Sequence, residues 1–164
     1  MTLAGADFDL LYRKHAPGAF LRARRMLGND ADAHEVVHDL FLSLLQAPEQ
    51  FAGRSSVTAF MYQAITHACL NRLRNQRTRA RILQLQAQAP ADAAQAHHRL
   101  HPERLATLFS ELQRMPENLA TVAVYYYLDG LTHDEIARLL SCSARHVGNL
   151  VARVHGWSNQ EANA

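Results

Sequence analysis

Residues 143–155 carry polar side chains that can hydrogen bond to nucleic acid, and they recur at the spacing of one helix face. These side chains are Ser143, Arg145, His146, Asn149 and Arg153. An arginine can donate two hydrogen bonds to a guanine base, whereas a serine hydroxyl can donate one to a phosphate oxygen. The apolar residues of the segment fall on the opposite face: Val147, Leu150 or Val151, and Val154. The segment therefore predicts a helix with one buried face and one face that can contact DNA.

A shorter helix is predicted just before this one. Thr132 followed by Glu135 forms a capping box, so a helix begins at about His133. Apolar residues then recur at helical spacing as far as Ser141, and Ser143 can cap the next helix. Two short helices joined by a turn are typical of a helix-turn-helix, whose second helix enters the major groove of DNA. The same spacing also fits two amphipathic helices of an ordinary small bundle.

Arginines are concentrated in the middle of the chain. The segment from Gln50 to Ala91 has no acidic residue but has six arginines, namely Arg54, Arg72, Arg74, Arg77, Arg79 and Arg81. Acids gather instead in the preceding segment, at Asp30, Asp32, Glu35 and Asp39. The net charge of +2 says little about partners, but this distribution predicts a basic helix that can neutralise phosphates. A run of charges also fits a helix face that is only solvated.

Helical periodicity predicts an all-α fold, because no segment alternates with a period of two between turn signals. A first helical region runs from about residue 7 to 27, interrupted or bent near Pro17, and Gly28-Asn29-Asp30 predicts a helix end followed by a cap. A second helix spans about 31–46. A long helix then begins near Val57, after a serine cap, and continues into the arginine run.

A change in composition divides the chain into two parts. Alanine and glutamine dominate from residue 83 to about 101, with Pro90 among them, which predicts a flexible linker. Helices from Pro102 to about 115 and from Pro116 to about 128 precede the helix-turn-helix. We therefore predict two small helical domains, at 5–81 and 102–157, joined by a linker at 82–101 and followed by a tail at 158–164.

The composition excludes several classes of protein. With 164 residues, of which 48% are hydrophobic, the chain can bury real cores. Its longest nearly apolar run, Leu119 to Leu128, is about half of what a bilayer needs, so we expect a cytoplasmic protein without membrane insertion. Cys69 and Cys142 fall in different helical units, which favours reduced thiols. No nucleophile with histidine and acid, and no glycine-rich phosphate loop, is present, so we predict neither an enzyme nor a cofactor.

Two further clusters invite functional interpretations. His97, His98 and His101 could ligate a metal, but no cysteine or carboxylate completes the set, and the same holds for Cys142 with His146. We predict no metal site, and a metal-sensing switch stays an alternative. Three consecutive tyrosines, Tyr125 to Tyr127, suggest a stacking platform, but consecutive helical residues face different ways, which favours packing in the core and at its rim.

Three ordered motifs resemble the extracytoplasmic-function (ECF) sigma factors, over about residues 7–156. Residues 32–42 resemble the core-binding helix of that family, residues 60–74 its promoter-melting and −10-reading helix, and residues 116–137 its −35-reading domain. The chain departs from the common pattern at several positions: Phe60 stands for tryptophan, His67 for asparagine and His38 for glutamine. Gly148 and Leu150 stand where many members carry lysine and arginine, so −35 contacts are weaker or shift to Arg145, His146 and Arg153.

The resemblance implies an alternative sigma factor that binds core RNA polymerase, directs it to promoters and helps to melt the −10 region. Contacts to the coiled coil of the largest polymerase subunit would come from Glu35, Val36, His38, Asp39, Leu40 and Phe41. Contacts to the −10 element, with a flipped base held near residues 52–58, would come from Arg54, Ser55, Ser56, His67, Asn71, Arg72, Arg74 and Arg77. The polar face of residues 143–153 would contact −35 DNA. Further implied partners are the polymerase flap region, double- and single-stranded promoter DNA, and an anti-sigma factor.

Alternatives remain at this point. A helix-turn-helix regulator could bind operator DNA without acting as a polymerase subunit, and the acidic helix would discriminate between the two. Asp30 and Asp32 also suit the start of their own helix, where the helix dipole favours negative charge, whereas Asp39 fits a partner better.

Overall fold

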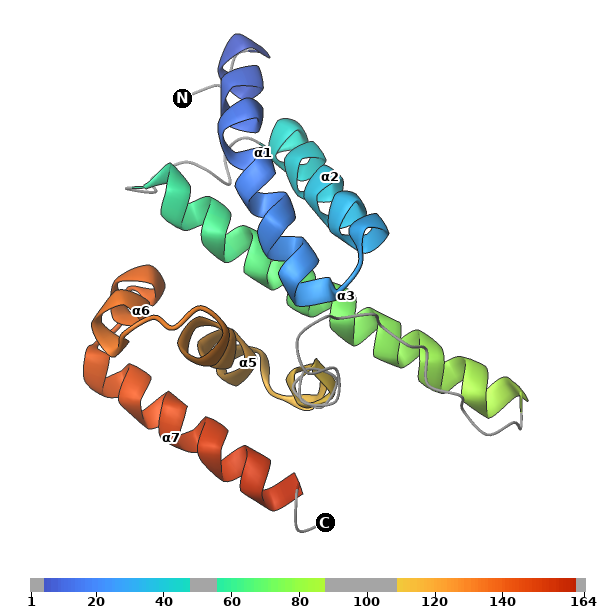
Figure 1. Ribbon diagram of the computed structural model, residues 1–164, viewed down its shortest axis with the longest axis vertical. Helices are drawn as coiled ribbons and strands as arrows, with labels where there is room; N and C mark the ends of the chain where they lie inside the picture. The colour runs from blue at the N-terminus through green and yellow to red at the C-terminus, as the bar shows by residue number, and fades with distance from the viewer. Residues whose placement is uncertain (1–4, 48–55, 88–108, 162–164) are drawn as a thin grey trace. The chain divides into compact units, whose positions relative to one another are not determined.

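The computed structural model describes residues 5–47, 56–87 and 109–161, and every regular element in these ranges is helical (Figure 1). The predicted all-α fold is therefore confirmed. The elements are α1 (Gly5–Leu27), α2 (Asp30–Gln46), α3 (Val57–Ala87), α5 (Glu117–Ala123), a π-helical stretch η2 (Val124–Leu128), α6 (His133–Leu140) and α7 (Ala144–Glu161). Residues 109–114 are also helical. The chain divides into two compact units, with α1 to α3 in the first and α5 to α7 in the second.

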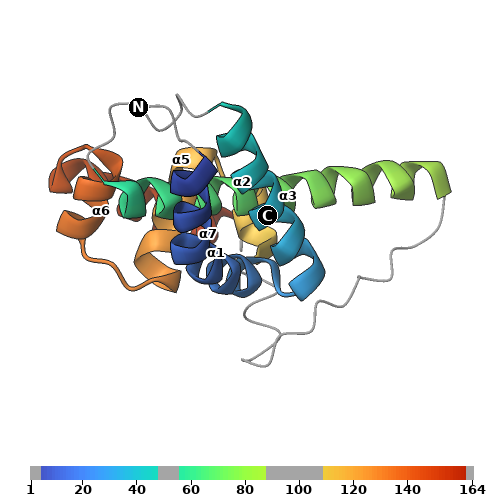
Figure 2. The same ribbon diagram turned by 90° about the horizontal axis from the view of Figure 1, so that it is seen from above.

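In the first unit, α1, α2 and α3 pack against one another around a shared apolar core. Its most deeply buried side chains are Ala23, Met26, Ala33, Leu44, Ile65, Cys69 and Leu70. Leu73 is the last buried residue of α3 as far as residue 82, where the description of its side chains ends. Beyond it α3 runs on past the ends of α1 and α2, as both views show (Figures 1 and 2). The basic half of α3 therefore projects from the three-helix core.

Helix α1 continues through Pro17, so of the two predicted outcomes, an interruption or a bend, the interruption does not occur, and α1 changes direction along its length (Figure 1). Proline removes one backbone hydrogen bond, but Pro17 lies on the exposed side of α1. Leu11 and Ala16 before it and Ala19 and Ala23 after it are all buried against the unit. This packing holds both halves of α1 in one helix.

The turn between α1 and α2 follows the sequence prediction. Gly28 has a positive φ of 82°, and its N–H donates to the Arg24 carbonyl. Asn29 then caps α2, because its Oδ1 accepts the backbone N–H of Asp32 at 2.8 Å. The start of α2 is therefore fixed by side chains as well as by packing.

Helix α3 extends further than the sequence indicates. Residues 82–87, which we assigned to the linker, continue the helix to Ala87. They are isoleucine, leucine, glutamine and alanine, which tolerate or favour a helix. No proline or glycine occurs from the start of α3 at Val57 up to Pro90. The remainder of the predicted linker lies outside the described residues.

In the second unit, the core is formed by α5, η2, α6 and α7. Its most deeply buried side chains include Leu112, Ala120, Val122, Tyr125, Ile136 and Val147. The three tyrosines point in different directions, as expected: Tyr125 is buried, Tyr126 half-buried and Tyr127 44% exposed. In the part of the chain that the structure describes, no helix combines the length and the apolar character needed to cross a bilayer.

Candidate nucleic-acid interface

Helices α6 and α7 form the predicted helix-turn-helix. The capping box is present, since the Thr132 hydroxyl accepts the Glu135 N–H at 3.3 Å and the Glu135 carboxylate accepts the Thr132 N–H at 2.8 Å. The Thr132 hydroxyl also donates to the Glu135 carboxylate at 2.7 Å, and the hydrogen bonds from the Thr132 N–H and hydroxyl lower the pKa of Glu135. Ser141 ends α6 in the left-handed region with φ 53°, and the Ser143 hydroxyl accepts the His146 N–H at 3.2 Å to cap α7. Short-range contacts therefore define both ends of the turn.

The two faces of α7 divide as the sequence predicts. The buried face consists of Val147, Leu150, Val151 and Val154. The exposed residues are Ser143, Arg145, His146, Asn149 and Arg153. Because Leu150 packs into the core, it is unavailable to DNA. Gly148 approaches α6 closely, since a Cβ at this position would lie 3.7 Å from the His133 ring.

The polar residues of α3 lie on two opposite faces, because residues two apart on a helix point in nearly opposite directions. One face carries residues at the spacing i, i+4, i+7, i+11 and i+14, namely His67, Asn71, Arg74, Thr78 and Arg81. We call these five residues the α3 stripe. All five are half-buried or exposed, and Arg74 donates a hydrogen bond to Asn71 at 3.4 Å. Arg77 is exposed and borders the stripe.

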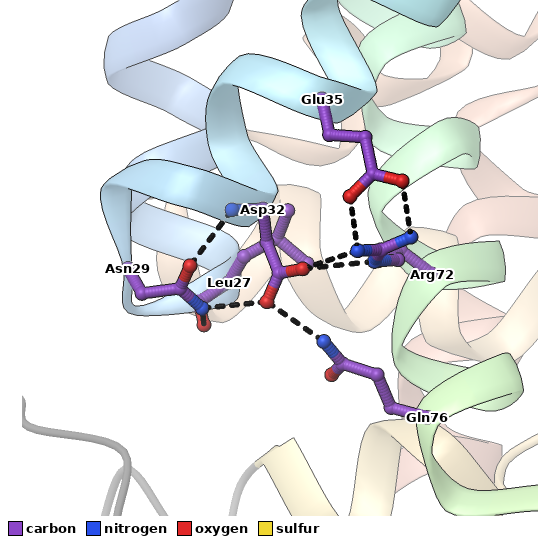
Figure 3. A network of polar contacts seen from close by, with 6 residues as sticks. All are labelled: Leu27, Asn29, Asp32, Glu35, Arg72 and Gln76. Atoms are coloured by element: carbon purple, nitrogen blue, oxygen red, sulfur yellow. Dashed lines mark hydrogen bonds and ion pairs between the residues drawn. The ribbon is translucent and has the colours of Figure 1, made fainter. Parts of the chain in front are cut away.

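Arg72 lies on the opposite face of α3, where it contacts α2 (Figure 3). Its Nε donates to Oδ1 of Asp32 at 3.0 Å and its Nη1 to Oε1 of Glu35 at 3.2 Å, while Nη2 donates to both carboxylates. One turn further along α3, Gln76 donates to Oδ2 of Asp32 at 2.8 Å, and Asn29 donates to the same oxygen. We call these five residues the Arg72 network.

Electrostatics within the Arg72 network favour the charged forms of Asp32 and Arg72. Burial raises the pKa of Asp32, but hydrogen bonds from Asn29, Arg72 and Gln76 outweigh it, so the pKa of Asp32 lies below its ordinary value. Hydrogen bonds to Asp32 and Glu35 raise the pKa of Arg72. The side chain of Asp32 is 17% exposed and that of Glu35 54% exposed. Asp32 is therefore the more buried carboxylate of the network, and Glu35 is the more exposed one.

A second cluster attaches the first half of α3 to α1. Arg22 donates two hydrogen bonds to the buried Thr66 hydroxyl, from Nε at 3.0 Å and from Nη2 at 2.9 Å. Its guanidinium lies 3.8 Å from the centroid of the Tyr62 ring, and Thr66 donates to the Tyr62 carbonyl at 2.7 Å. Sequence reasoning missed Arg22, because its contacts lie 44 positions away in the chain.

Helix α2 presents a face that differs in part from the prediction. Glu35, His38 and Asp39 are exposed and Leu40 is half-buried. Val36 and Phe41 lie in the core of the first unit, at 6% and 2% exposure, so their side chains cannot offer apolar area to a partner as we expected. The apolar side chains that do reach the surface of this helix are Leu42, at 41% exposure, and Leu45, at 52%.

Aromatic contacts explain the burial of Phe41. Its ring meets the edges of two rings from α1, with centroids 4.8 Å from Tyr12 and 6.2 Å from Phe8. Phe41 therefore packs against α1, on the side of α2 away from its exposed face. The motif at residues 32–42 contains both buried and exposed residues, and its sequence does not show which are which.

Other predicted site residues are placed as follows. Ser56 is exposed and its hydroxyl accepts the Ala59 N–H at 3.3 Å, so it caps α3. Arg54 and Ser55 lie outside the described residues, as do His97, His98 and His101. Within the described ranges, no three histidine, cysteine or acidic side chains gather as metal ligands.

Burial raises the pKa of the Cys69 thiol to about 12, despite an opposing effect of Arg22, so this thiol stays protonated at neutral pH.

Comparison with known families agrees with this division into two units. Residues 11–79 match the model of sigma-70 region 2, and residues 106–155 match the model of sigma-70 region 4. The chain belongs to the sigma-70 family of RNA polymerase sigma factors, and within it to the ECF type.

Two relatives illustrate the similarity. The ECF RNA polymerase sigma factor SigE of Mycolicibacterium smegmatis is 24% identical over 158 residues, which cover 94% of this chain and 60% of the relative. The RNA polymerase sigma-H factor of Pseudomonas aeruginosa is 25% identical over 158 residues, which cover 90% of this chain and 80% of the relative. The chain thus spans less than two thirds of the SigE relative's length.

Proposed function

We propose that this protein is an alternative sigma factor that binds core RNA polymerase, directs it to specific promoters and helps to melt the −10 region. The observation that carries this proposal is the presence of sigma-70 regions 2 and 4, in this order, in one chain. Each unit also presents a polar helix face suited to DNA. Two modest contacts on one tether gain from effective concentration, so neither unit needs high affinity alone.

The second unit recognises −35 DNA through the exposed face of α7. Arg145, next to the start of the helix, reaches a base edge, whereas Ser143 and Arg153 contact phosphates. His146 and Asn149 lie between these positions and add hydrogen bonds. The Ser143 hydroxyl already accepts a backbone N–H, but it retains its own proton for a phosphate oxygen.

The first unit contacts the −10 region through the α3 stripe. Its arginines, with Arg77 beside them, follow the phosphate backbone, which makes binding strongly dependent on salt. His67 and Asn71 lie on the same face, closer to the start of α3, and we assign the capture of an unpaired base to them together with residues near Ser56. The stripe thus combines an electrostatic part and a base-contacting part on one helix face.

Helix α2 binds the polymerase through its exposed face. Asp39 and Glu35 offer negative charge to arginines of the coiled coil of the largest subunit, and His38 lies between them. Leu42 and Leu45 supply the apolar area that Val36 and Phe41 cannot. The second unit contacts the flap region of polymerase, and an anti-sigma factor that covers the α2 face would block polymerase binding.

Transcription with purified sigma-free polymerase tests this function. We expect the protein to confer defined start sites on a genomic promoter library. Asp39→Lys should abolish co-purification with core polymerase, because it reverses a charge on the exposed α2 face. Asp9→Lys is the matched control, since Asp9 is an equally accessible acid on α1 that pairs only with Arg13, and it should leave polymerase binding unchanged.

Two results would contradict the proposal. A folded protein that selects no start site would exclude sigma activity. Sequence-specific DNA binding that Asp39→Lys leaves intact, without any binding of polymerase by the wild type, would favour the operator-binding regulator. Glu35→Lys is a poor probe, because it also breaks the hydrogen bonds to Arg72.

A further inference from the structure

We propose that Arg72 is a positioning residue rather than a DNA contact: with Asp32 it holds α3 against α2 and so fixes the direction of the α3 stripe. This inference rests on the proposed function, since it concerns how the stripe meets the −10 region. It reassigns Arg72, which hydrogen bonds to α2, and it gives Asp32 a role in promoter opening.

The hydrogen-bonding capacity of Arg72 is nearly used up within the protein. A guanidinium has five N–H donors. The four hydrogen bonds to Asp32 and Glu35 engage Nε, Nη1 and Nη2. A phosphate would have to displace a carboxylate before it could receive the usual paired hydrogen bonds of an arginine.

The local charge also opposes a phosphate at this position. One guanidinium faces two carboxylates, so the Arg72 network carries a net negative charge. Arg74, only two residues further along, points to the opposite side of α3, where it donates a hydrogen bond to the uncharged Asn71. The two carboxylates of α2 therefore lie beside Arg72.

The location of the network indicates what it does. Leu73, between Arg72 and Arg74, is buried, and residues 74–82 are half-buried or exposed, so the helix leaves the three-helix core at this point. Arg72 and Gln76 bind Asp32 on two successive turns around this exit, and Asn29 fixes Asp32 at the start of α2 (Figure 3). The projecting half of α3 is thus held to α2 on one face, at the point where it leaves the core. The α3 stripe lies on the opposite face.

The variant Asp32→Asn distinguishes the two possible roles of Arg72, phosphate contact and positioning. The first predicts a gain in promoter affinity and the second a loss of open complex. If Arg72 bound phosphate, Asp32→Asn would remove a nearby acid and free the guanidinium, so promoter affinity would rise. If Arg72 positions α3, Asp32→Asn and Arg72→Ala should both lower the yield of open complex with polymerase, by about fivefold or more. Asp39→Asn is unsuitable as a control because Asp39 lies on the polymerase face, so Asp9→Asn serves instead.

Two further readouts distinguish positioning from phosphate contact. Arg74→Ala should reduce the slope of log affinity against log salt by about one, whereas Arg72→Ala should leave the slope unchanged. The charge swap Asp32→Arg with Arg72→Asp should recover most of the open-complex yield, because it rebuilds the ion pair while placing an acid at position 72. A swap variant that is folded but as inactive as Arg72→Asp alone would overturn the proposal, as would a rise in affinity with Asp32→Asn.

A distance measurement tests the positioning without polymerase or DNA. Spin labels on the exposed Ala31 and Ala80, in a Cys142→Ser background, report the direction of the projecting half of α3 relative to α2. We expect one narrow distribution for the wild type and broader ones for Arg72→Ala and Asp32→Asn. Unchanged distributions would overturn the positioning role whatever the transcription assays show. Failure of the wild type to initiate transcription would instead overturn the proposed function.

Discussion

Helices α3 and α7 both carry arginines, but their surroundings differ. The exposed face of α7 is set by short-range features: the capping box, the Ser143 cap and four apolar residues at helical spacing. On α3 the decisive contacts come from α2, whose Asp32 and Glu35 lie about forty positions earlier and bind Arg72. The exposed polar face of α7 can therefore be identified from the sequence, whereas on α3 the neighbouring helix α2 engages Arg72 through contacts distant in the sequence.

The largest effect should be the loss of stability in Arg72→Ala. Asp32 would keep its place beside the core but lose its charged donor, and we expect a cost of about 2 kcal/mol in the free energy of opening α2 and α3. Amide hydrogen exchange in these helices measures this quantity. Arg74→Ala is the matched control and should cost less than about 0.5 kcal/mol. Equal losses in the two variants would remove the distinction between the two faces of α3.

On α7, Arg145→Ala should weaken binding to the −35 element by roughly 1 to 3 kcal/mol if Arg145 contacts a base. Competition between promoters with intact and altered −35 sequences measures this effect. Arg153→Ala should instead weaken binding to both promoters alike, as expected of a phosphate contact. An identical loss on both promoters for Arg145→Ala would assign Arg145 to phosphate as well.

Acid should weaken the α2–α3 contact through Asp32. The pKa of Asp32 is lower in the folded protein than the value of about 3.9 of an exposed aspartate. Its contribution to stability is therefore fully present above about pH 4 and is lost as the pH falls through the folded value. The difference in stability between wild type and Asp32→Asn, measured by hydrogen exchange or urea unfolding, should shrink below about pH 4. A constant difference down to pH 2 would contradict this ionic role.

The smallest effect should be a gain in stability at Gly148 of α7. Glycine inside a helix costs about 0.5–1 kcal/mol relative to alanine. A Cβ at position 148 meets the His133 ring at 3.7 Å, an ordinary contact distance. Gly148→Ala should therefore raise the free energy of unfolding of the second unit by about 0.5 kcal/mol, as urea denaturation would show. A destabilised variant would mean that α6 and α7 need closer contact than this distance indicates.

Features set by nearby residues could be predicted from the sequence. Caps and apolar spacing predict both ends of α6, the start of α7, the turn at Asn29 and the start of α3. The predicted end of α7 was wrong, because the helix runs to Glu161 and includes residues 158–161 of the predicted tail. Val36 and Phe41 show the limit, because a family motif does not tell which of its residues pack inward. Phe41 packs against aromatic side chains of α1, and Leu42 and Leu45 are the large apolar side chains of α2 that are exposed.

Charge patterning along the chain does not include the neighbouring helix. The absence of acids between residues 50 and 91 predicted a basic helix. In three dimensions α2 lies beside α3, and its Asp32 and Glu35 bind Arg72. Spacing on the helix could have separated Arg72 from Arg74, but only the structure shows which side faces α2.

Crosslinking from two positions in one complex tests most directly whether both units contact promoter DNA at the same time. A photoreactive residue at Thr78 on the α3 stripe and another at Asn149 on α7 would be placed in a complex of protein, core polymerase and promoter DNA. We expect Thr78 to crosslink near the −10 element and Asn149 at the −35 element of the same DNA molecule. Crosslinks from both positions to a single element would contradict the arrangement. So would crosslinks to the −10 element from position 79 in place of position 78, because position 79 does not belong to the α3 stripe.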